Sequence, residues 1–278
     1  MESLAETIQA AARAFGMRGD GSLEYIGLTA DTEKGRVRSR VYHKRTEAPE
    51  EIFEPPFPEL LERFAQWRRT PGVRLVDVSE DRPADILLYR LVFALPKNAG
   101  EEQQALLLKP FLQAAGLPEE QARRFGARAA SYQTNREVLY QIGALFTADG
   151  TAEGFKYYYL LSDEAWQRKK DRLPEESRAQ FGAVCENGYR PYFSGVNDDG
   201  TVSEEKLYFV TKRIGFRTDA KVQDAKAVAR ALGCRHLLTD ETVEEIAKEN
   251  IYLDGLAVSV GEPGKLRFYF AEQKALKR

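Results

Sequence analysis

Four segments of the chain repeat the same order of apolar and polar positions. Each begins with an apolar strand pattern that contains a glycine, continues through a polar turn rich in Asp, Gly or Pro, and closes with alternating residues. Two period-2 runs around a polar turn are typical of a β-hairpin. The four segments are 25–45, 141–162, 192–213 and 252–273, and a weaker copy without the glycine spans 73–93.

Helical patterns separate the hairpins. Apolar residues recur at i, i+3 or i+4 in these stretches, which predicts amphipathic helices. The patterns cover 57–70, 101–116 and 163–181, and two more, 221–233 and 242–251, occupy the final linker. Hairpins and helices therefore alternate along the chain, and five hairpins supply ten antiparallel strands.

Ten such strands make either an open sheet or a barrel, and closure into a barrel removes both edges. We therefore predict an α/β (α+β) fold, a single domain over residues 1–278, with a ten-stranded antiparallel barrel and an outer ring of helices. A ten-stranded barrel has a lumen wider than side chains alone fill, so a ligand is expected inside it.

The closing strands also repeat a chemistry, in which a basic residue, an apolar residue and a tyrosine follow one another. Side chains alternate faces along a strand, so the basic residue and the tyrosine share one face. The apolar face suits packing against helices, and the polar face is expected to point into the lumen. The basic residues are Arg40, Lys156, Lys206 and Arg267, joined by Arg38, and the tyrosines are Tyr158, Tyr208 and Tyr269, with Tyr89 in the weak copy, which has leucine in place of the cation.

These cations would repel one another inside a closed barrel unless an anion lay between them. A diphosphate suits both the forked donors of Arg and the point charge of Lys. Each desolvated tyrosine face stabilises a cation by about 2 kcal/mol. An allylic diphosphate, which separates into an anionic leaving group and an allylic cation, would satisfy both residue types. One such copy alone would be interpreted as the solvent-exposed face of a strand, but four equivalent copies favour a functional role for the set.

Composition narrows the alternatives. The formal net charge of −2 provides no global field for nucleic acid or an anionic membrane. Two cysteines and two histidines exclude a disulfide framework and His-rich metal sites. No signal-peptide pattern or long apolar span is visible, so we expect a cytoplasmic protein. Asp77 to Asp81 is the nearest approach to an aspartate-rich metal motif and lies in a predicted turn, so we expect no protein-built metal site.

The repeat pattern over nearly the whole chain resembles the ABBA prenyltransferases, whose PT barrel is built from five ααββ units. Short stretches look most like the cyanobactin peptide prenyltransferases, which modify RiPP peptides. These stretches are Gly21-Ser22-Leu23-Glu24, Ser39-Arg40, Tyr192-Phe193-Ser194-Gly195 and Leu266-Arg267-Phe268-Tyr269.

The resemblance implies a transferase that moves a dimethylallyl or geranyl group from its diphosphate to an electron-rich side chain of a macrocyclic peptide inside the barrel. It implies that Glu24 is the base or orienter for the acceptor. The basic residues of the closing strands would hold the diphosphate, and the tyrosines, Tyr89 included, would shield the allylic carbon. Mg²⁺ would arrive on the diphosphate, and a bulky Phe193 would favour a five-carbon donor over a ten-carbon one.

Two alternatives stay open. One is an aromatic prenyltransferase that acts on a small indole or phenol. The other is a non-catalytic barrel that binds an anionic amphipathic ligand, for which Glu24 would be dispensable.

Overall fold

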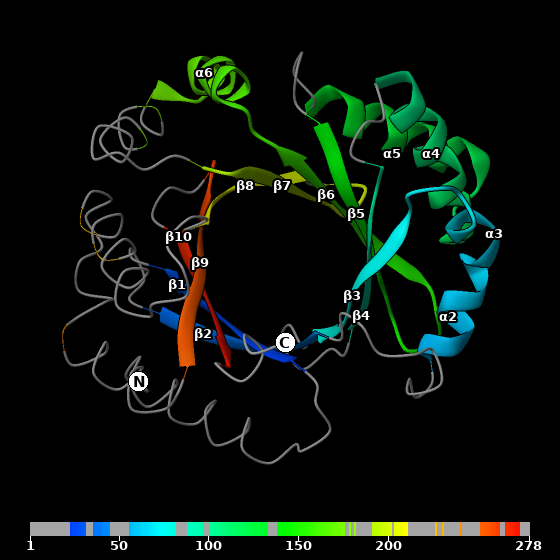
Figure 1. The fold of residues 1–278 in the computed structure, drawn as a ribbon, viewed down its shortest axis with the longest axis horizontal. Helices are drawn as coiled ribbons and strands as arrows, with labels where there is room; N and C mark the ends of the chain where they lie inside the picture. The colour runs from blue at the N-terminus through cyan, green and yellow to red at the C-terminus, as the bar shows by residue number, and fades with distance from the viewer. Residues whose placement is uncertain are drawn as a thin grey trace. The chain divides into compact units, whose positions relative to one another are not determined.

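The computed structural model describes ten segments and five single positions of the chain (Figure 1). They form two compact units, of which the first comprises Met1–Lys44, Lys170–Tyr192 and Lys206–Arg278, and the second Arg45–Lys169 and Phe193–Glu205. The prediction of a single domain stays a prediction. The described residues are 23–31, 36–44, 56–81, 88–96, 101–132, 138–175, 178, 181, 191–201, 203–210, 226, 230, 240, 251–261 and 265–272.

The second unit contains an antiparallel sheet in the order β3-β4-β5-β6-β7. The register shifts between Leu139 and Gln141 on β5, so Tyr140 occupies an irregular position in the strand. These strands correspond to the weak hairpin, to the predicted hairpin over 141–162 and to the first strand of the one over 192–213. Their bounds are β3 Arg74–Asp81, β4 Leu88–Ala94, β5 Val138–Phe146, β6 Ala152–Leu160 and β7 Phe193–Asp198.

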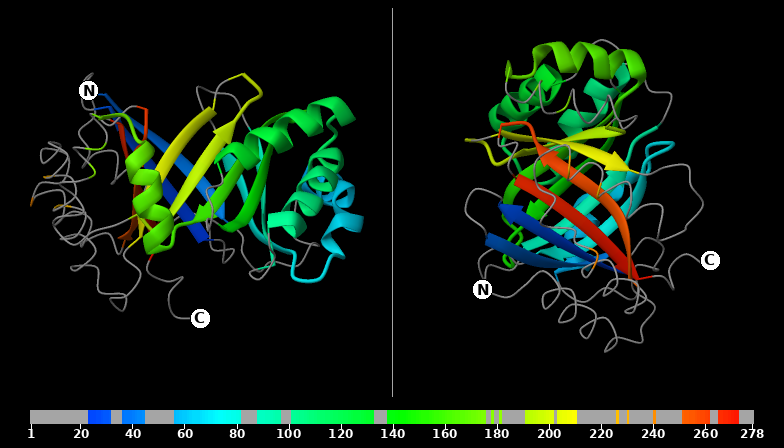
Figure 2. Two further views of the ribbon diagram at one scale, coloured as in Figure 1. Left: turned by 90° about the horizontal axis from the view of Figure 1, so that it is seen from above. Right: turned by 90° about the vertical axis from the view of Figure 1, so that its left-hand side faces the viewer.

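Helices α2 to α5 lie against one face of this sheet, as the views in Figures 1 and 2 agree. The sequence pattern did not predict α5, although Ala122, Phe125 and Ala129 are buried at helical spacing. Helix α4 ends shortly before Gly116, whose φ of 95° is left-handed and suits a helix C-terminus. The bounds are α2 Phe57–Arg63, α3 Ala65–Arg68, α4 Glu101–Ala114, α5 Glu119–Tyr132 and α6 Asp163–Arg172.

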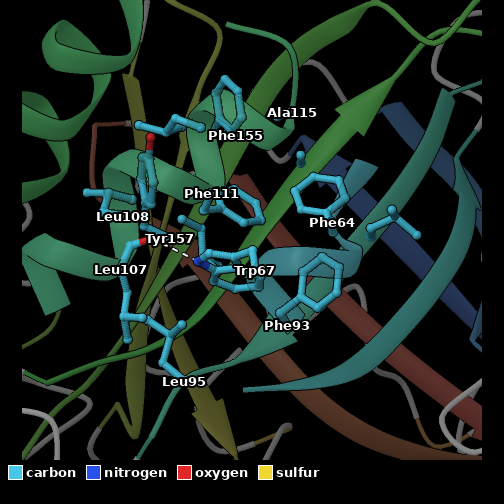
Figure 3. Packing of buried hydrophobic residues seen from close by; sticks show 14 of the residues in the cluster. Phe64, Trp67, Phe93, Leu95, Leu107, Leu108, Phe111, Ala115, Phe155 and Tyr157 are labelled. Atoms are coloured by element: carbon cyan, nitrogen blue, oxygen red, sulfur yellow. Dashed lines mark hydrogen bonds between the residues drawn. The ribbon is translucent and has the colours of Figure 1, made fainter. Parts of the chain in front are cut away.

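An aromatic cluster fills the space between these helices and the sheet (Figure 3). Trp67 lies at 5.0 Å between ring centres from Phe111 and at 5.2 Å from Phe93. Its Nε1 donates to the Leu107 carbonyl O at 3.0 Å, so the indole N–H is satisfied inside the core. Trp67 is therefore a packing residue, and the apolar sheet face is committed to the helices.

The first unit contains a second antiparallel ladder in the order β2-β1-β10-β9-β8. Strand β8 begins in the second unit, to which Ser203–Glu205 belong. Across the described residues the two ladders supply the ten antiparallel strands that the sequence predicts, while closure into a barrel stays a prediction. The bounds are β1 Leu23–Asp31, β2 Arg36–Lys44, β8 Ser203–Val210, β9 Ile251–Ser259 and β10 Lys265–Glu272.

The helices predicted over 221–233 and 242–251 lie outside the described residues apart from a few single positions. In the part of the chain that is described, every helix is too short or too polar to cross a membrane.

Candidate active site

Strand β6 presents different chemistry on its two faces. Phe155, Tyr157 and Tyr159 belong to the buried cluster that includes helix residues, and Figure 3 shows Phe155 and Tyr157 near Phe111. Lys156 and Tyr158 alternate with these residues and therefore point away from the helices. This is the alternation that the sequence pattern predicts. We call the side of each ladder that carries the Lys/Arg-x-Tyr residues the inner face.

An aromatic surface lies beside the cation on the inner face of the second unit. Lys156 Nζ lies 4.8 Å from the centre of the Tyr158 ring. Phe193 of β7 lies edge-on to Tyr158, at 5.8 Å between ring centres, and also to Tyr140 of β5, at 6.1 Å. Lys156 is 7% exposed and Tyr158 is 9% exposed, so little water competes for either group. The arrangement places a buried positive charge at one end of an aromatic surface.

Polar side chains continue the inner face beside Lys156. Asn197 of β7 lies opposite Lys156 in the strand register and donates from Nδ2 to Oε2 of Glu204 at 3.3 Å. Gly143 of β5 lies opposite Lys156 on the other side. A Cβ atom at Gly143 would stand 3.1 Å from Cγ2 of Val92, so glycine keeps β4 and β5 close at this position. A cation, an amide and a carboxylate therefore lie in one row across the strands.

Strand β4 contradicts one prediction. Tyr89 packs edge-on against Phe57 of α2, with 5.1 Å between ring centres, and belongs with Leu91 to the helix-covered cluster. The placement of Tyr89 on the inner face is therefore wrong. The neighbouring residue, Arg90, takes the inner position because it lies opposite Leu145, out of phase with the helix-facing residues of β4. The weak repeat thus carries a cation after all, directly after its tyrosine and three positions beyond Leu87, which occupies the cation position of the other copies.

In the first unit, the predicted residues of β8 and β10 share a face. Tyr208 and Arg267 both lie opposite Ala257 of β9, one on each side. The rings of Tyr208 and Tyr269 are 5.9 Å apart and inclined by 30°. Lys206 precedes Tyr208 by two positions and is 1% exposed. A second buried cation therefore adjoins a pair of tyrosines.

The register also places the basic positions of β2 and the predicted base of β1. Arg40 pairs with Gly27, which pairs on its other side with Tyr269 of β10. Arg38 occupies the equivalent position one step along, opposite Thr29. Glu24 instead pairs with His43, three positions before Gly27.

Four inner-face residues of the second unit did not enter the predicted site. Arg90, Asn197 and Glu204 carry no repeated pattern, and Tyr140 reaches Phe193 from an irregular part of β5. A sequence signal existed for Tyr140, because it stands three residues before the hairpin glycine, where the other copies hold Glu24, Tyr192 and Tyr252. Among the described residues, no group of three or more His, Cys, Asp or Glu side chains could hold a metal ion.

No protein-family profile and no curated protein sequence matches the chain. Among solved structures, the chain is similar to the crystal structure of AnaPT from Neosartorya fischeri, with a TM-score of 0.54 and 10% sequence identity. The alignment covers 92% of this chain and 79% of AnaPT. AnaPT is a fungal indole prenyltransferase of the ABBA superfamily. This chain has a prenyltransferase-like fold.

At this identity the likeness shows the fold alone, so the site rests on the residues of this chain. A prenyltransferase-like fold agrees with the paired strands and outer helices expected from the repeat. The likeness gives no support to the narrower resemblance to cyanobactin enzymes.

Proposed function

We propose that the protein is a prenyltransferase that moves an allylic group from its diphosphate to an aromatic acceptor, within a closed PT barrel. The observation that carries the proposal is the position of buried Lys156 over Tyr158, on the sheet face opposite the one that the described helices cover. The fold shared with AnaPT supports this aromatic acceptor, an indole or a phenol, better than a cyclic peptide.

The cations on the inner faces would bind the diphosphate of the donor. Arginine offers paired N–H donors and lysine a point charge, and both strengthen when water is excluded. Arg90 joins the predicted set because the register brings it to the inner face. The proposed donor-binding residues are Arg38, Arg40, Arg90, Lys156, Lys206 and Arg267.

The transfer step follows from the chemistry of the donor. The C–O bond of the allylic diphosphate breaks, the electron pair leaves with the diphosphate, and positive charge develops on the allylic carbon. Tyrosine and phenylalanine faces stabilise that charge without reacting with it. The acceptor carbon then forms the new C–C bond and releases a proton to a carboxylate. Tyr158, Tyr208, Tyr269 and Phe193 are the proposed aromatic shield, and Glu24 is the proposed proton acceptor.

Mg²⁺ would bind together with the donor diphosphate. The carboxylate of Glu204 and the amide oxygen of Asn197 are the hard donors that this ion prefers, and both lie on the inner face beside Lys156. When bound, the ion would neutralise charge on the departing diphosphate. The residues present therefore fit a substrate-borne Mg²⁺.

The direct test is mass spectrometry of reactions that contain dimethylallyl or geranyl diphosphate, Mg²⁺ and a panel of acceptors. The panel should include free tryptophan, a simple phenol, and cyclic peptides displaying Tyr, Trp, His, Arg or Ser. We expect a mass gain of one prenyl unit on an indole or phenol, lost in Lys156→Ala and retained in Lys109→Ala. Lys109 is a suitable control because it forms an exposed ion pair with Glu119.

Other outcomes assign the protein elsewhere. A gain on cyclic peptides alone would return the assignment to a peptide prenyltransferase. Diphosphate binding without any product, abolished by Lys206→Ala, would indicate a non-catalytic binding barrel. If the protein forms no product and binds no diphosphate, the proposal is overturned.

A further inference from the structure

The end of the β7–β8 hairpin is tied to helix α5 by a buried ion pair. Arg128 Nη1 lies 3.0 Å from Asp198 Oδ1, with the Asp198 side chain fully buried and the Arg128 side chain 32% exposed. The same guanidinium donates from Nη2 to the Gly200 carbonyl O at 2.6 Å. Arg128 therefore holds both the last residue of β7 and the backbone of the turn that follows.

The turn is shaped to accept this contact. The Gly200 N–H donates to Asp198 Oδ1 at 3.0 Å, and the Thr201 N–H donates to Asp199 Oδ1 at 2.8 Å. Gly200 has a left-handed φ of 91°, and a Cβ atom there would stand 3.1 Å from Cζ of Phe125 on α5. Glycine therefore allows the turn to lie directly against the helix that carries Arg128.

A second ion pair holds the next strand from the same side. Lys169 Nζ of α6 lies 2.7 Å from Oε1 of Glu205 on β8, and the two side chains are 7% and 16% exposed. Ion pairs at such burial require both partners, because a single buried charge is strongly unfavourable. The two strands that leave the turn are thus each fixed to a helix.

The residues next to these anchors face the other way. Asn197 precedes Asp198 and Glu204 precedes Glu205, and neighbouring side chains on a strand point to opposite faces. Asn197 lies opposite Lys156 and donates to Glu204, so both residues belong to the inner face. A displacement of the outer anchors would therefore move the polar row beside Lys156.

We propose that Arg128 and Lys169 are positioning residues, which clamp the β7–β8 hairpin from outside so that Asn197 and Glu204 face the diphosphate-binding Lys156. This inference rests on the proposed function for its consequence in donor binding. The clamp itself follows from the contacts alone. Neither residue touches the donor, and both act through the backbone of the hairpin.

The test compares Arg128→Met with Arg123→Met in the full-length protein. Arg123 is the matched control because it lies on the same helix and forms an exposed pair with Glu120. Both proteins would be titrated calorimetrically with dimethylallyl S-thiolodiphosphate, a donor that does not react, at a temperature where circular dichroism shows them folded. We expect about tenfold weaker binding in Arg128→Met, since small displacements at a site are costly. Arg123→Met should stay within about twofold, as is usual for a surface pair.

The double variant Arg128→Met/Asp198→Asn separates positioning from simple stability. Removing the isolated carboxylate should recover thermal stability, but the lost bond to Gly200 should keep donor binding weak. Recovery of both properties together would overturn the positioning role, as would wild-type affinity in a folded Arg128→Met protein.

Failure of the proposed function gives a different result. If the wild-type protein does not bind the thiolodiphosphate, donor binding is wrong, and hydrogen exchange over 193–210 still decides the clamp. Faster exchange in Arg128→Met than in Arg123→Met supports the clamp, and equal exchange in the two proteins contradicts it.

Discussion

The amine of Lys156 lies 4.8 Å from the centre of the Tyr158 ring, two positions along the same strand. Both side chains are more than nine-tenths buried, and Phe193 borders the ring at 5.8 Å between ring centres. The ring face therefore already accepts a positive charge in a place that water scarcely reaches. An allylic cation formed beside Lys156 would find the same stabilisation.

Two substitutions of Tyr158 should distinguish the contribution of its aromatic ring to transfer from that of its hydroxyl group. Tyr158→Leu removes the aromatic face, and a cation–π contribution of about 2 kcal/mol corresponds to about a 30-fold fall in kcat. Tyr158→Phe keeps the face and should retain transfer within a few-fold. Single-turnover rates with dimethylallyl diphosphate measure both effects. Equal losses in the two variants would mean that the hydroxyl, and not the ring, carries the role.

Arg90 and Tyr89 should show opposite behaviour although they are neighbours. Loss of one charge-assisted contact to the diphosphate in Arg90→Gln should raise the KM for the donor about tenfold. Tyr89→Phe should leave donor kinetics unchanged because Tyr89 packs against Phe57 on the helix side. Steady-state kinetics at saturating acceptor provide the measurement. A reversed pattern would show that the inner face of β4 has been assigned to the wrong residues.

The contrast between these two residues shows how far the sequence could lead. The alternation in β6 was predictable because Lys156 and Tyr158 are flanked by large apolar residues on the same strand. In the weak repeat the tyrosine itself belongs to the apolar face, so the alternating pattern assigned Tyr89 to the wrong face of β4. The contribution of Tyr140 depends on a register shift beside it, which hydrophobic period does not reveal.

Contacts between distant segments were beyond any local pattern. Arg128 and Asp198 are separated by 70 positions, and no pattern near either residue in the sequence predicts their ion pair. Helix α5 was itself missed, because its few buried positions stand among many charged residues. The repeated hairpins therefore predicted the strands well and the tertiary supports of the site poorly.

The two candidate carboxylates can be distinguished by paired substitutions. If Glu24 accepts the proton, Glu24→Gln should lower kcat about 100-fold or more with little change in donor affinity. Glu204 lies in the row beside Lys156, so Glu204→Gln should act mainly on the Mg²⁺ dependence of donor binding. Turnover and calorimetric binding with and without Mg²⁺ measure the difference. A large kcat loss in Glu204→Gln, with Glu24→Gln unaffected, would assign the role of base to Glu204.

Phe193 should control donor length if the prenyl chain extends over the aromatic surface. Its ring fills the space between Tyr140 and Tyr158. Phe193→Gly opens that space and should shift preference from dimethylallyl toward geranyl diphosphate, whereas Phe193→Leu should retain the shorter donor. Competition between the two donors, followed by mass spectrometry of the product, measures the ratio. An unchanged ratio in Phe193→Gly would place the chain elsewhere.

Asp198 should give the protein an unusual dependence of stability on pH. Burial raises the pKa of its carboxyl group above the usual value, and the Gly200 N–H and Arg128 only partly oppose that effect. Because the folded protein then holds this proton more tightly than the unfolded chain, ionisation of Asp198 disfavours folding. Its contribution to stability should therefore improve as pH falls through the raised pKa toward 3.8, the unperturbed value.

Asp198→Asn removes the titratable carboxyl group and with it this contribution to the dependence of stability on pH. On acidification from neutral pH, the wild-type protein should lose less unfolding free energy than Asp198→Asn, as measured by urea denaturation at a series of pH values. The control is Asp149→Asn, because Asp149 is an exposed turn carboxylate whose pKa is lowered by its bonds to Thr147 and Thr151. That variant should show the opposite sign, since a lowered pKa makes the ionised group stabilising and its loss on acidification costly. Parallel pH profiles for wild type and Asp198→Asn would mean that Arg128 fully compensates the buried charge.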